Sequence, residues 1–188
     1  MEHAGERWQE FNARDERIEN GGRDPRSGNP DKGDDVYVSV AIVWLFRRTK
    51  NGIEVLFQQR SEKVDRYPGD WDIAAGGHIN YGESVVDAAV REAKEEIGAE
   101  ITADMLHFVV STPSLFKNNI LREFVCDYTG QPENFHFDDG EVSQVKWVPL
   151  SEFDDFILKN AKKPLKEDAE IRSLVKKRLM TYGDSESS

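Results

Sequence analysis

The sequence predicts an α/β fold, in which helices pack on a mixed sheet. Two observations carry this prediction. Residues 36–46, VYVSVAIVWLF, form an almost continuous apolar and β-branched run, which is typical of a strand covered on both faces. Residues 85–97 carry apolar side chains at helical spacing, which gives a helix one face to bury. Strand-like runs on both sides of this helix, and a second helical region near the end of the chain, indicate layers of helix and sheet.

Length and composition are those of a soluble globular protein. The chain of 188 residues is long enough for one domain with a real core, with 38% hydrophobic and 32% charged residues. No run approaches the roughly 18 apolar residues that span a bilayer, and the N-terminus has no apolar signal region. We therefore expect no membrane association and a cytoplasmic location.

The net charge and the cysteine content exclude further classes of protein. A net charge of −11 argues against nucleic-acid binding, which needs a basic surface to neutralise phosphates. Cys126 is the only cysteine, so the chain can form neither an internal disulfide nor a zinc cluster of cysteines. Because Cys126 lies in the apolar run FVCDY, we expect a buried thiol rather than a nucleophile.

The residue pattern divides the chain into an N-terminal arm and flexible loop (1–35), a domain (36–180) and a disordered tail (181–188). Residues 1–19 fit either a strand, turn and strand or a helical arm, and the pattern does not choose between them. Residues 20–35 predict a loop, because they are rich in Gly, Pro, Asp and Asn.

The first half of the domain predicts a hairpin and a glycine turn. Asn51-Gly52 is a hairpin-turn pair, and residues 54–59 return as the partner of the first strand. After a polar connection, residues 73–75 form a short apolar strand that leads into Gly76-Gly77. Consecutive glycines allow a tight turn, so we expect backbone carbonyl groups to be open to a ligand there.

The second half of the domain predicts more strands and two helices. The expected strands cover residues 105–111, 120–128 and 142–148. Ser151 and Asp154 stand at capping-box-like spacing for a short helix over residues 151–159. Pro164 suits the start of a longer amphipathic helix that reaches about residue 180.

The helix over residues 85–97 carries Glu92, Glu95 and Glu96, which share one face because they are spaced i, i+3 and i+4. Each like-charged pair destabilises an exposed helix by roughly 0.2–0.5 kcal/mol. A bound divalent cation would reverse that sign, although glutamate-rich faces are often only solvated surface. Gly98 suits the left-handed residue that ends the helix.

The spacing around this helix resembles the Nudix box. Its specified positions are filled in the order Gly77-x5-Glu83-x7-Arg91-Glu92-Ala93-x-Glu95-Glu96-x-Gly98-Ala99, with alanine a smaller residue than usual at position 93. The resemblance implies an α/β/α sandwich with a mixed central sheet, in which the box forms a loop, a helix and a loop. It also implies hydrolysis of a diphosphate linkage in a small-molecule substrate such as a nucleoside diphosphate derivative.

The resemblance further assigns roles within the box. Glu92, Glu95 and Glu96 hold Mg²⁺, or Mn²⁺ as an alternative, with help from the backbone carbonyl of Gly76. Hard cations of this kind prefer oxygen ligands. Glu83 and Arg91 brace the loop by an ion pair.

Glu92, Glu96 and Glu141 are the expected catalytic residues. The general base comes either from Glu92 in the box or from Glu141 in a later loop, and both choices stay open. Arg60 is the expected phosphate-binding residue, because the arginine fork suits phosphate.

A narrower similarity covers residues 58–83 and resembles the branch that includes isopentenyl diphosphate isomerase. That isomerase has a catalytic cysteine where this chain has Gly76, and one of its metal-binding histidines falls at Val38. Both departures favour hydrolysis over isomerisation. The isomerase and a Nudix-fold binding module without turnover remain as alternatives, and family members are often homodimers.

Overall fold

The computed structural model describes residues 7–23, 36–114, 118–138 and 140–183, and within them nine strands form one mixed sheet. The strands are β1 (Trp8–Asn12), β2 (Arg17–Arg23), β3 (Val36–Thr49), β4 (Gly52–Arg60), β5 (Trp71–Ile73), β6 (Ala75–His78), β7 (Leu106–Pro113), β8 (Asn119–Asp127) and β9 (Val142–Pro149). The helices are α1 (Val85–Ile97), α2 (Phe153–Asn160), α3 (Lys163–Glu167) and α4 (Ala169–Gly183), with 3-10 turns η2 (Ala103–Met105) and η3 (Leu150–Glu152).

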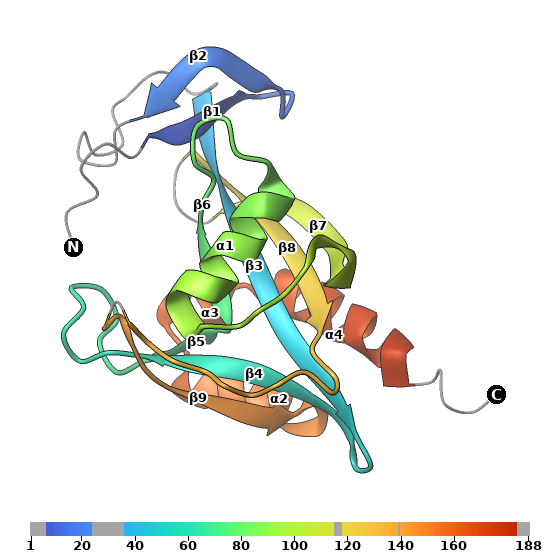
Figure 1. Ribbon diagram of the computed structural model, residues 1–188. Coiled ribbons are helices and arrows are strands. Elements are labelled where there is room, and N and C mark those ends of the chain that lie inside the picture. The colour runs from blue at the N-terminus through green and yellow to red at the C-terminus, as the bar shows by residue number, and fades with distance from the viewer. Residues whose placement is uncertain (1–6, 24–35, 115–117, 139, 184–188) are drawn as a thin grey trace.

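β3 is the central strand of the sheet (Figure 1). It pairs antiparallel with β1, β6 and β4 at successive positions along its length. It pairs parallel with β8, from Val38 opposite Asn119 to Phe46 opposite Asp127. β9 and β5 pair with β4, β7 pairs with β8, and β2 extends the sheet beyond β1. The predicted α/β fold with a mixed sheet is confirmed.

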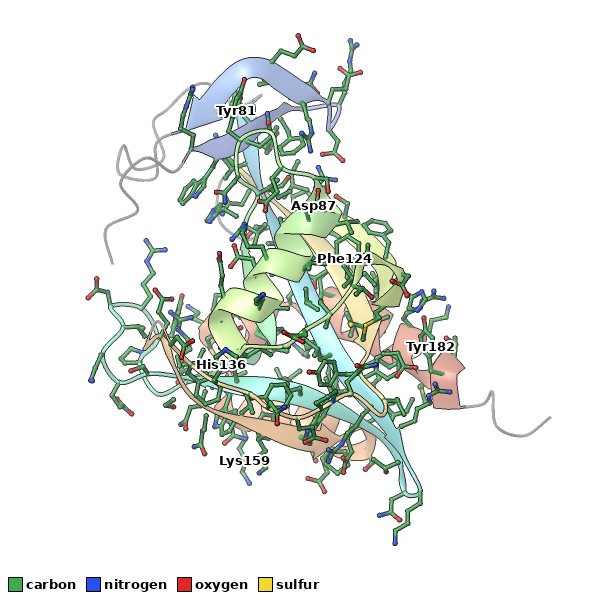
Figure 2. All side chains as sticks on the ribbon, in the orientation of Figure 1. Tyr81, Asp87, Phe124, His136, Lys159 and Tyr182 are labelled. Carbon is green, nitrogen blue, oxygen red and sulfur yellow. The ribbon has the colours of Figure 1, made fainter. Side chains whose placement is uncertain are left out.

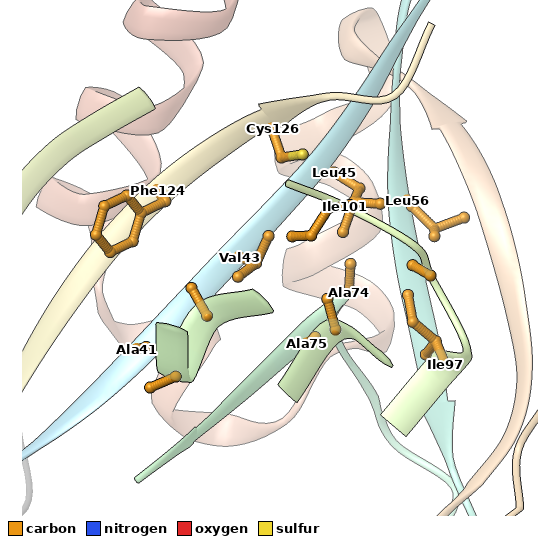
Figure 3. Close-up of a cluster of buried hydrophobic side chains, with 14 of the residues drawn as sticks. Ala41, Val43, Leu45, Leu56, Ala74, Ala75, Ile97, Ile101, Phe124 and Cys126 are labelled. Atoms are coloured by element: carbon orange, nitrogen blue, oxygen red, sulfur yellow. The ribbon is translucent and has the colours of Figure 1, made fainter. Parts of the chain in front are cut away.

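Alternation along β3 places a core on each face of the sheet. Val43 and Leu45 pack on the α1 side together with Ile97 (Figure 3). Trp44 and Phe46 point the other way, toward the face that α2, α3 and α4 cover. Since both faces of β3 are covered, its sequence is apolar from Val40 to Phe46, and the result is a three-layer α/β/α sandwich.

The predicted glycine turn before α1 is wrong in its position. Gly76 and Gly77 lie within strand β6, where they pair with Ile42 and Ala41 of β3. The chain turns later, at Gly82, whose φ of 82° favours glycine. At Gly77, an added Cβ would lie 2.1 Å from Oε1 of Glu92, so any larger residue would displace that carboxylate.

The N-terminal segment forms a strand, a turn and a strand, which decides between the two predicted alternatives. β2 continues to Arg23, so the predicted loop begins later than residue 20, and residues 24–35 lie outside the described parts of the chain. None of the described helices is long and apolar enough to cross a membrane.

The C-terminal helical region differs from the prediction. The single helix expected from Pro164 is divided into α3 and α4 at Asp168, which has a non-helical ψ of 74°. Asp168 Oδ1 accepts the backbone N–H of Ile171 at 3.0 Å and so caps α4. α4 continues to Gly183, and the rest of the predicted tail is not described. The expected cap at Ser151 is absent, because η3 occupies that position and α2 has no side-chain cap.

Candidate active site

Helix α1 has well-defined ends. Oγ of Ser84 accepts the backbone N–H of Asp87 at 3.0 Å and caps the first turn. Gly98 ends the helix with a φ of 66°, and a Cβ there would lie 2.1 Å from Nδ1 of His136. The His136 ring therefore covers the end of the helix (Figure 2). These two caps define where α1 begins and ends.

The loop before α1 is held by the predicted ion pair. Nε of Arg91 lies 2.8 Å from Oε1 of Glu83, and Nη2 of Arg91 donates to the carbonyl of His78 at 2.9 Å. Burial alone would raise the pKa of Glu83, but hydrogen bonds from Arg91 and from the Asn80 amide bring that pKa below its ordinary value. Glu83 is thus a charged brace between strand β6 and the helix.

The β1–β2 hairpin braces the same loop from outside, which the sequence did not reveal. The backbone N–H of Gln9 donates to the carbonyl of Ile79 at 2.8 Å. Oε1 of Gln9 accepts the N–H of Gly82 at 3.1 Å. Arg17 of β2 donates to the carbonyl of Glu83.

Two aromatic side chains stand where the hairpin meets the loop. The Trp8 ring stacks on the His78 imidazole with ring centroids 3.6 Å apart and an angle of 7° between the planes. Tyr81 lies beside the hairpin, with the Arg7 guanidinium 5.1 Å from its ring centre (Figure 2). The hairpin therefore contributes side chains to the surroundings of the box as well as strands to the sheet.

The three glutamates of α1 lie on one flank but have different partners. Nη1 of Arg91 donates to Glu92 at 2.7 Å and to Glu95 at 2.9 Å. Oε2 of Glu96 instead accepts Nε2 of Gln58 at 2.5 Å, from strand β4. Arg91 thus supplies positive charge to two of the carboxylates, and the third faces the sheet.

Burial perturbs two of these carboxyl groups. It raises the pKa of Glu96 well above the ordinary value, and the neighbouring charge of Glu92 raises it further. Burial also raises the pKa of Glu92, although Arg91 opposes the effect. Two buried carboxylates that repel each other form an electrostatic arrangement that a cation would stabilise.

The side chains around α1 bear on whether the site can hold a metal ion. No three histidine, cysteine, aspartate or glutamate side chains converge as a metal site within the residues that the structure describes. Arg91 explains why these carboxylates do not converge, because its guanidinium group forms ion pairs with Glu92 and Glu95. The chemistry of the donor set does fit, since carboxylate oxygens beside a strand of glycines suit a hard divalent cation.

These residues surround one cavity of about 250 Å³, which we call the box cavity. It brings together Gly76, Gly77, Arg91, Glu92, Glu95, Glu96 and Glu141, with Trp8, His78 and Asn80 at its wall. Glu141, predicted from a distant loop, thus reaches the same cavity as the box glutamates. Its backbone carbonyl accepts the N–H of Ser61 at 2.7 Å, which fixes the loop beside strand β4.

A second cavity of about 220 Å³, which we call the deep cavity, shares Gly76 and Glu96 with the first. Arg60 lies here rather than in the box cavity, and its Nη1 is 3.7 Å from Oδ2 of Asp72. Nζ of Lys162 is closer to that same oxygen, at 2.5 Å. Asp72 lies in the stretch 58–83 that resembles the isomerase branch, but that resemblance assigned it no role, and Lys162 belongs to no local motif.

A sandwich of this architecture, with a loop, a helix and a carboxylate-lined cavity against the sheet, defines the class of the protein as a Nudix-type α/β/α fold. The family comparison agrees, because the NUDIX domain matches residues 36–169, more than half of the chain. The chain therefore belongs to the Nudix superfamily.

Two related proteins and one solved structure illustrate the likeness. Nudix hydrolase 3 of Arabidopsis thaliana is 33% identical over 133 residues, which cover 65% of this chain and 17% of the plant protein. Isopentenyl-diphosphate Delta-isomerase of Escherichia coli is 27% identical over 115 residues, or 58% of this chain and 60% of the isomerase. The crystal structure of DR0079 from Deinococcus radiodurans aligns with a TM-score of 0.65 and 22% identity, and it covers 92% of this chain and 98% of that one. The last likeness concerns the fold alone.

Proposed function

We propose that this protein is a hydrolase that uses Mg²⁺, or Mn²⁺ as an alternative, to cleave a P–O–P linkage in a small organic diphosphate. The observation that carries the proposal is the box cavity, which is lined by the three box glutamates, Glu141 and Gly76. Carboxylates alone would repel a diphosphate, so a bound cation has to mediate between them and the substrate.

Individual residues have distinct tasks in this proposal. Glu92, Glu95 and Glu96 would hold the cation with the Gly76 carbonyl, and the cation would lower the pKa of a water and neutralise phosphoryl oxygens. Glu83 and Arg91 keep the loop fixed against α1. Glu92 and Glu141 both border the cavity and are the two candidates for the base that removes a proton from the attacking water.

Isomerisation is disfavoured by packing at the position where the isomerase has its cysteine. A Cβ on Gly76 would lie 2.9 Å from Cδ1 of Ile73 and 3.0 Å from the carbonyl oxygen of Ala41, so a thiol has no room there. Cys126 cannot replace it. It is buried in the core on the α1 side (Figure 3), and burial raises its pKa to about 12.

The substitution Glu96→Gln tests the proposal. The amide keeps the size of the side chain but removes the charge, so we expect hydrolysis to fall at least about 100-fold because a ligand and a buried charge are lost. The measurement is product release, read by mass, from a panel of nucleoside triphosphates, dinucleotides, nucleotide sugars, coenzyme A and prenyl diphosphates with Mg²⁺ or Mn²⁺.

Glu100→Gln is the matched control, because Glu100 is exposed just beyond the end of α1. It removes one charge and should leave the rate within about twofold. Full activity in Glu96→Gln would overturn the proposed role of the box. Tight binding without turnover across the whole panel would identify a binding module instead.

A further inference from the structure

Gln58 is a buried polar side chain in a strand that is otherwise apolar at this point. The three residues before it in β4, Val55, Leu56 and Phe57, are fully buried. Gln58 itself has only 3% of its surface exposed, and its Nε2 donates to Oε2 of Glu96 at 2.5 Å. The amide of Gln58 therefore connects the sheet to the one box glutamate that Arg91 does not hold.

The orientation of this amide follows from the group that it faces. A carboxylate only accepts hydrogen bonds, so the reversed amide would place two acceptor oxygens against each other. In the observed orientation Oε1 of Gln58 is buried and has no hydrogen-bond partner among the described residues. An unpaired buried acceptor is costly, and an apolar side chain at this position would avoid that cost. The polar end of Gln58 thus acts only through its N–H group on Glu96.

The three box glutamates are held by donors of different charge. Arg91 donates to Glu92 and Glu95, so a positive group balances part of their negative charge. Glu96 receives only neutral donors among the described residues, namely Gln58 and the backbone N–H of Gly76 at 3.5 Å. A neutral amide fixes the position of a carboxylate and leaves its negative charge for another group to balance.

The two donors to Glu96 also differ in strength. Gln58 donates to Oε2 over a short distance, whereas the contact from Gly76 to Oε1 is at the limit for a hydrogen bond. Gln58 therefore supplies most of the constraint on this carboxylate. Because a carboxylate has about four lone-pair sites, Glu96 keeps acceptor capacity after both contacts, and its side chain lines the box cavity.

We propose that Gln58 is a positioning residue for the cation, because its N–H group holds the Glu96 carboxylate in place as a ligand of Mg²⁺ or Mn²⁺. This inference rests on the proposed function, which assigns Glu96 to the cation. Gln58 acts through Glu96 and contributes no ligand of its own. Partners that orient a metal-binding carboxylate typically account for 10- to 100-fold in metal affinity, so the loss of this one N–H group should be measurable.

The variant that tests this is Gln58→Met, which keeps the length of the side chain and removes the donor. We expect the Kd for Mn²⁺, measured by calorimetry with the metal alone, to rise about 10-fold. The Mg²⁺ concentration for half-maximal activity should rise by a similar factor, and kcat at saturating metal should stay within about threefold of wild type. Partial unfolding would instead lower kcat at every metal concentration. If Gln58→Met does not fold, Gln58→Asn replaces it, because the shorter side chain withdraws the amide from Glu96.

Gln59→Met is the matched control, because Gln59 is the next residue of β4 and its Nε2 donates to the carbonyl of Gly69 instead, at 2.8 Å. It should leave the Kd for Mn²⁺ within about twofold of wild type. An unchanged Kd in the Gln58 variant, or a loss of kcat that saturating metal does not restore, would overturn the inference. If the wild-type protein binds Mn²⁺ but hydrolyses no diphosphate of the panel, the proposed hydrolase is overturned. Weaker Mn²⁺ binding by the Gln58 variant would then still support the positioning role.

Discussion

The two cavities differ in how the chain builds them. The box cavity takes most of its wall from one continuous stretch, residues 76–96. The deep cavity takes its wall from residues scattered between Val40 and Ile171, on strands, a connection and two helices. Local spacing was enough to find the first, and only tertiary packing creates the second. A short motif can therefore locate one cavity without showing how the neighbouring cavity is built.

The cavities also differ in charge. The box cavity has carboxylates on one helix with a single arginine among them. In the deep cavity, Asp72 is paired with Lys162, and Glu123 is held by the neutral indole of Trp44. A charged partner stabilises a buried carboxylate. A neutral hydrogen-bond donor offsets little of the free-energy cost of burying that negative charge. The two environments should therefore respond differently to substitution and to pH.

The largest expected effect comes from Gly77→Ala, which disturbs the box cavity alone. The added Cβ would lie 2.1 Å from Oε1 of Glu92, so the carboxylate must move. We expect hydrolysis to fall by at least about 100-fold, because displacements near 1 Å have that cost in active sites. The Trp44 indole resonance should stay unchanged, which separates the two cavities.

Gly130→Ala is the control for that variant, because an added Cβ there meets nothing within 4 Å and only its φ of 75° is unfavourable. It should lower stability by about 1 kcal/mol and leave the rate unchanged. A rate equal to wild type in Gly77→Ala would show that Glu92 tolerates displacement.

An intermediate effect is expected from the deep cavity, in the pH dependence of stability. Burial raises the pKa of Glu123 to about 7, and only the hydrogen bond from Trp44 and the charge of Lys162 oppose the shift. In the unfolded chain this carboxyl ionises near its ordinary pKa, so wild type loses stability as pH rises from about 4.5 to 7. Glu123→Gln cannot ionise and escapes this loss.

Urea unfolding of both proteins at several pH values measures the difference. Relative to wild type, Glu123→Gln should gain roughly 3 kcal/mol between pH 4.5 and 8, with no further change above pH 8. Taking the difference between two proteins cancels the titration of groups that both contain. A constant difference across this range would mean that Glu123 ionises at the same pH in the folded and the unfolded protein.

The smallest effect is expected from Arg17→Met. Arg17 lies in the β1–β2 hairpin, which contacts the loop before α1. The substitution removes the donor to the Glu83 carbonyl and keeps much of the apolar stem. We expect the Mg²⁺ concentration for half-maximal activity to rise only a few-fold, as the loss of about 1 kcal/mol predicts. Arg14→Met, in the turn between β1 and β2, is the control. If Arg17→Met lost as much hydrolytic activity as Gly77→Ala, the hairpin would be an integral part of the site.

Much of the fold was predictable because its signals are local. The apolar run of β3 follows from burial on both faces, and the hairpin at Asn51-Gly52 follows from turn chemistry. The break at Asp168 was missed, although an aspartate that caps the next helix was visible in the sequence. The sequence could not show that Gly77 lies in a strand and contacts Glu92. A glycine in a turn is recognised by its backbone conformation, whereas Gly77 is close to the Glu92 side chain.

The site was predictable to the extent that it follows the box. Spacing along one helix identifies Glu92, Glu95 and Glu96, and the ion pair of Glu83 and Arg91 was predicted from the resemblance. Other groups have no such signal. Glu123 lies on a strand whose register with β3 alone brings it to Trp44, and Lys162 reaches Asp72 only because the chain after α2 returns to Trp71.

The parallel pairing of β3 with β8 has a consequence for how the chain folds. It joins residues about 80 positions apart, so a long loop must close before any of its hydrogen bonds can form. Both cavities need β3 in place, because β8, which carries Glu123, and β6, which carries Gly76, both pair with it. Refolding should therefore be slow for a chain of this size, and catalytic activity should return in a single late phase together with protection of the β3 amides from hydrogen exchange.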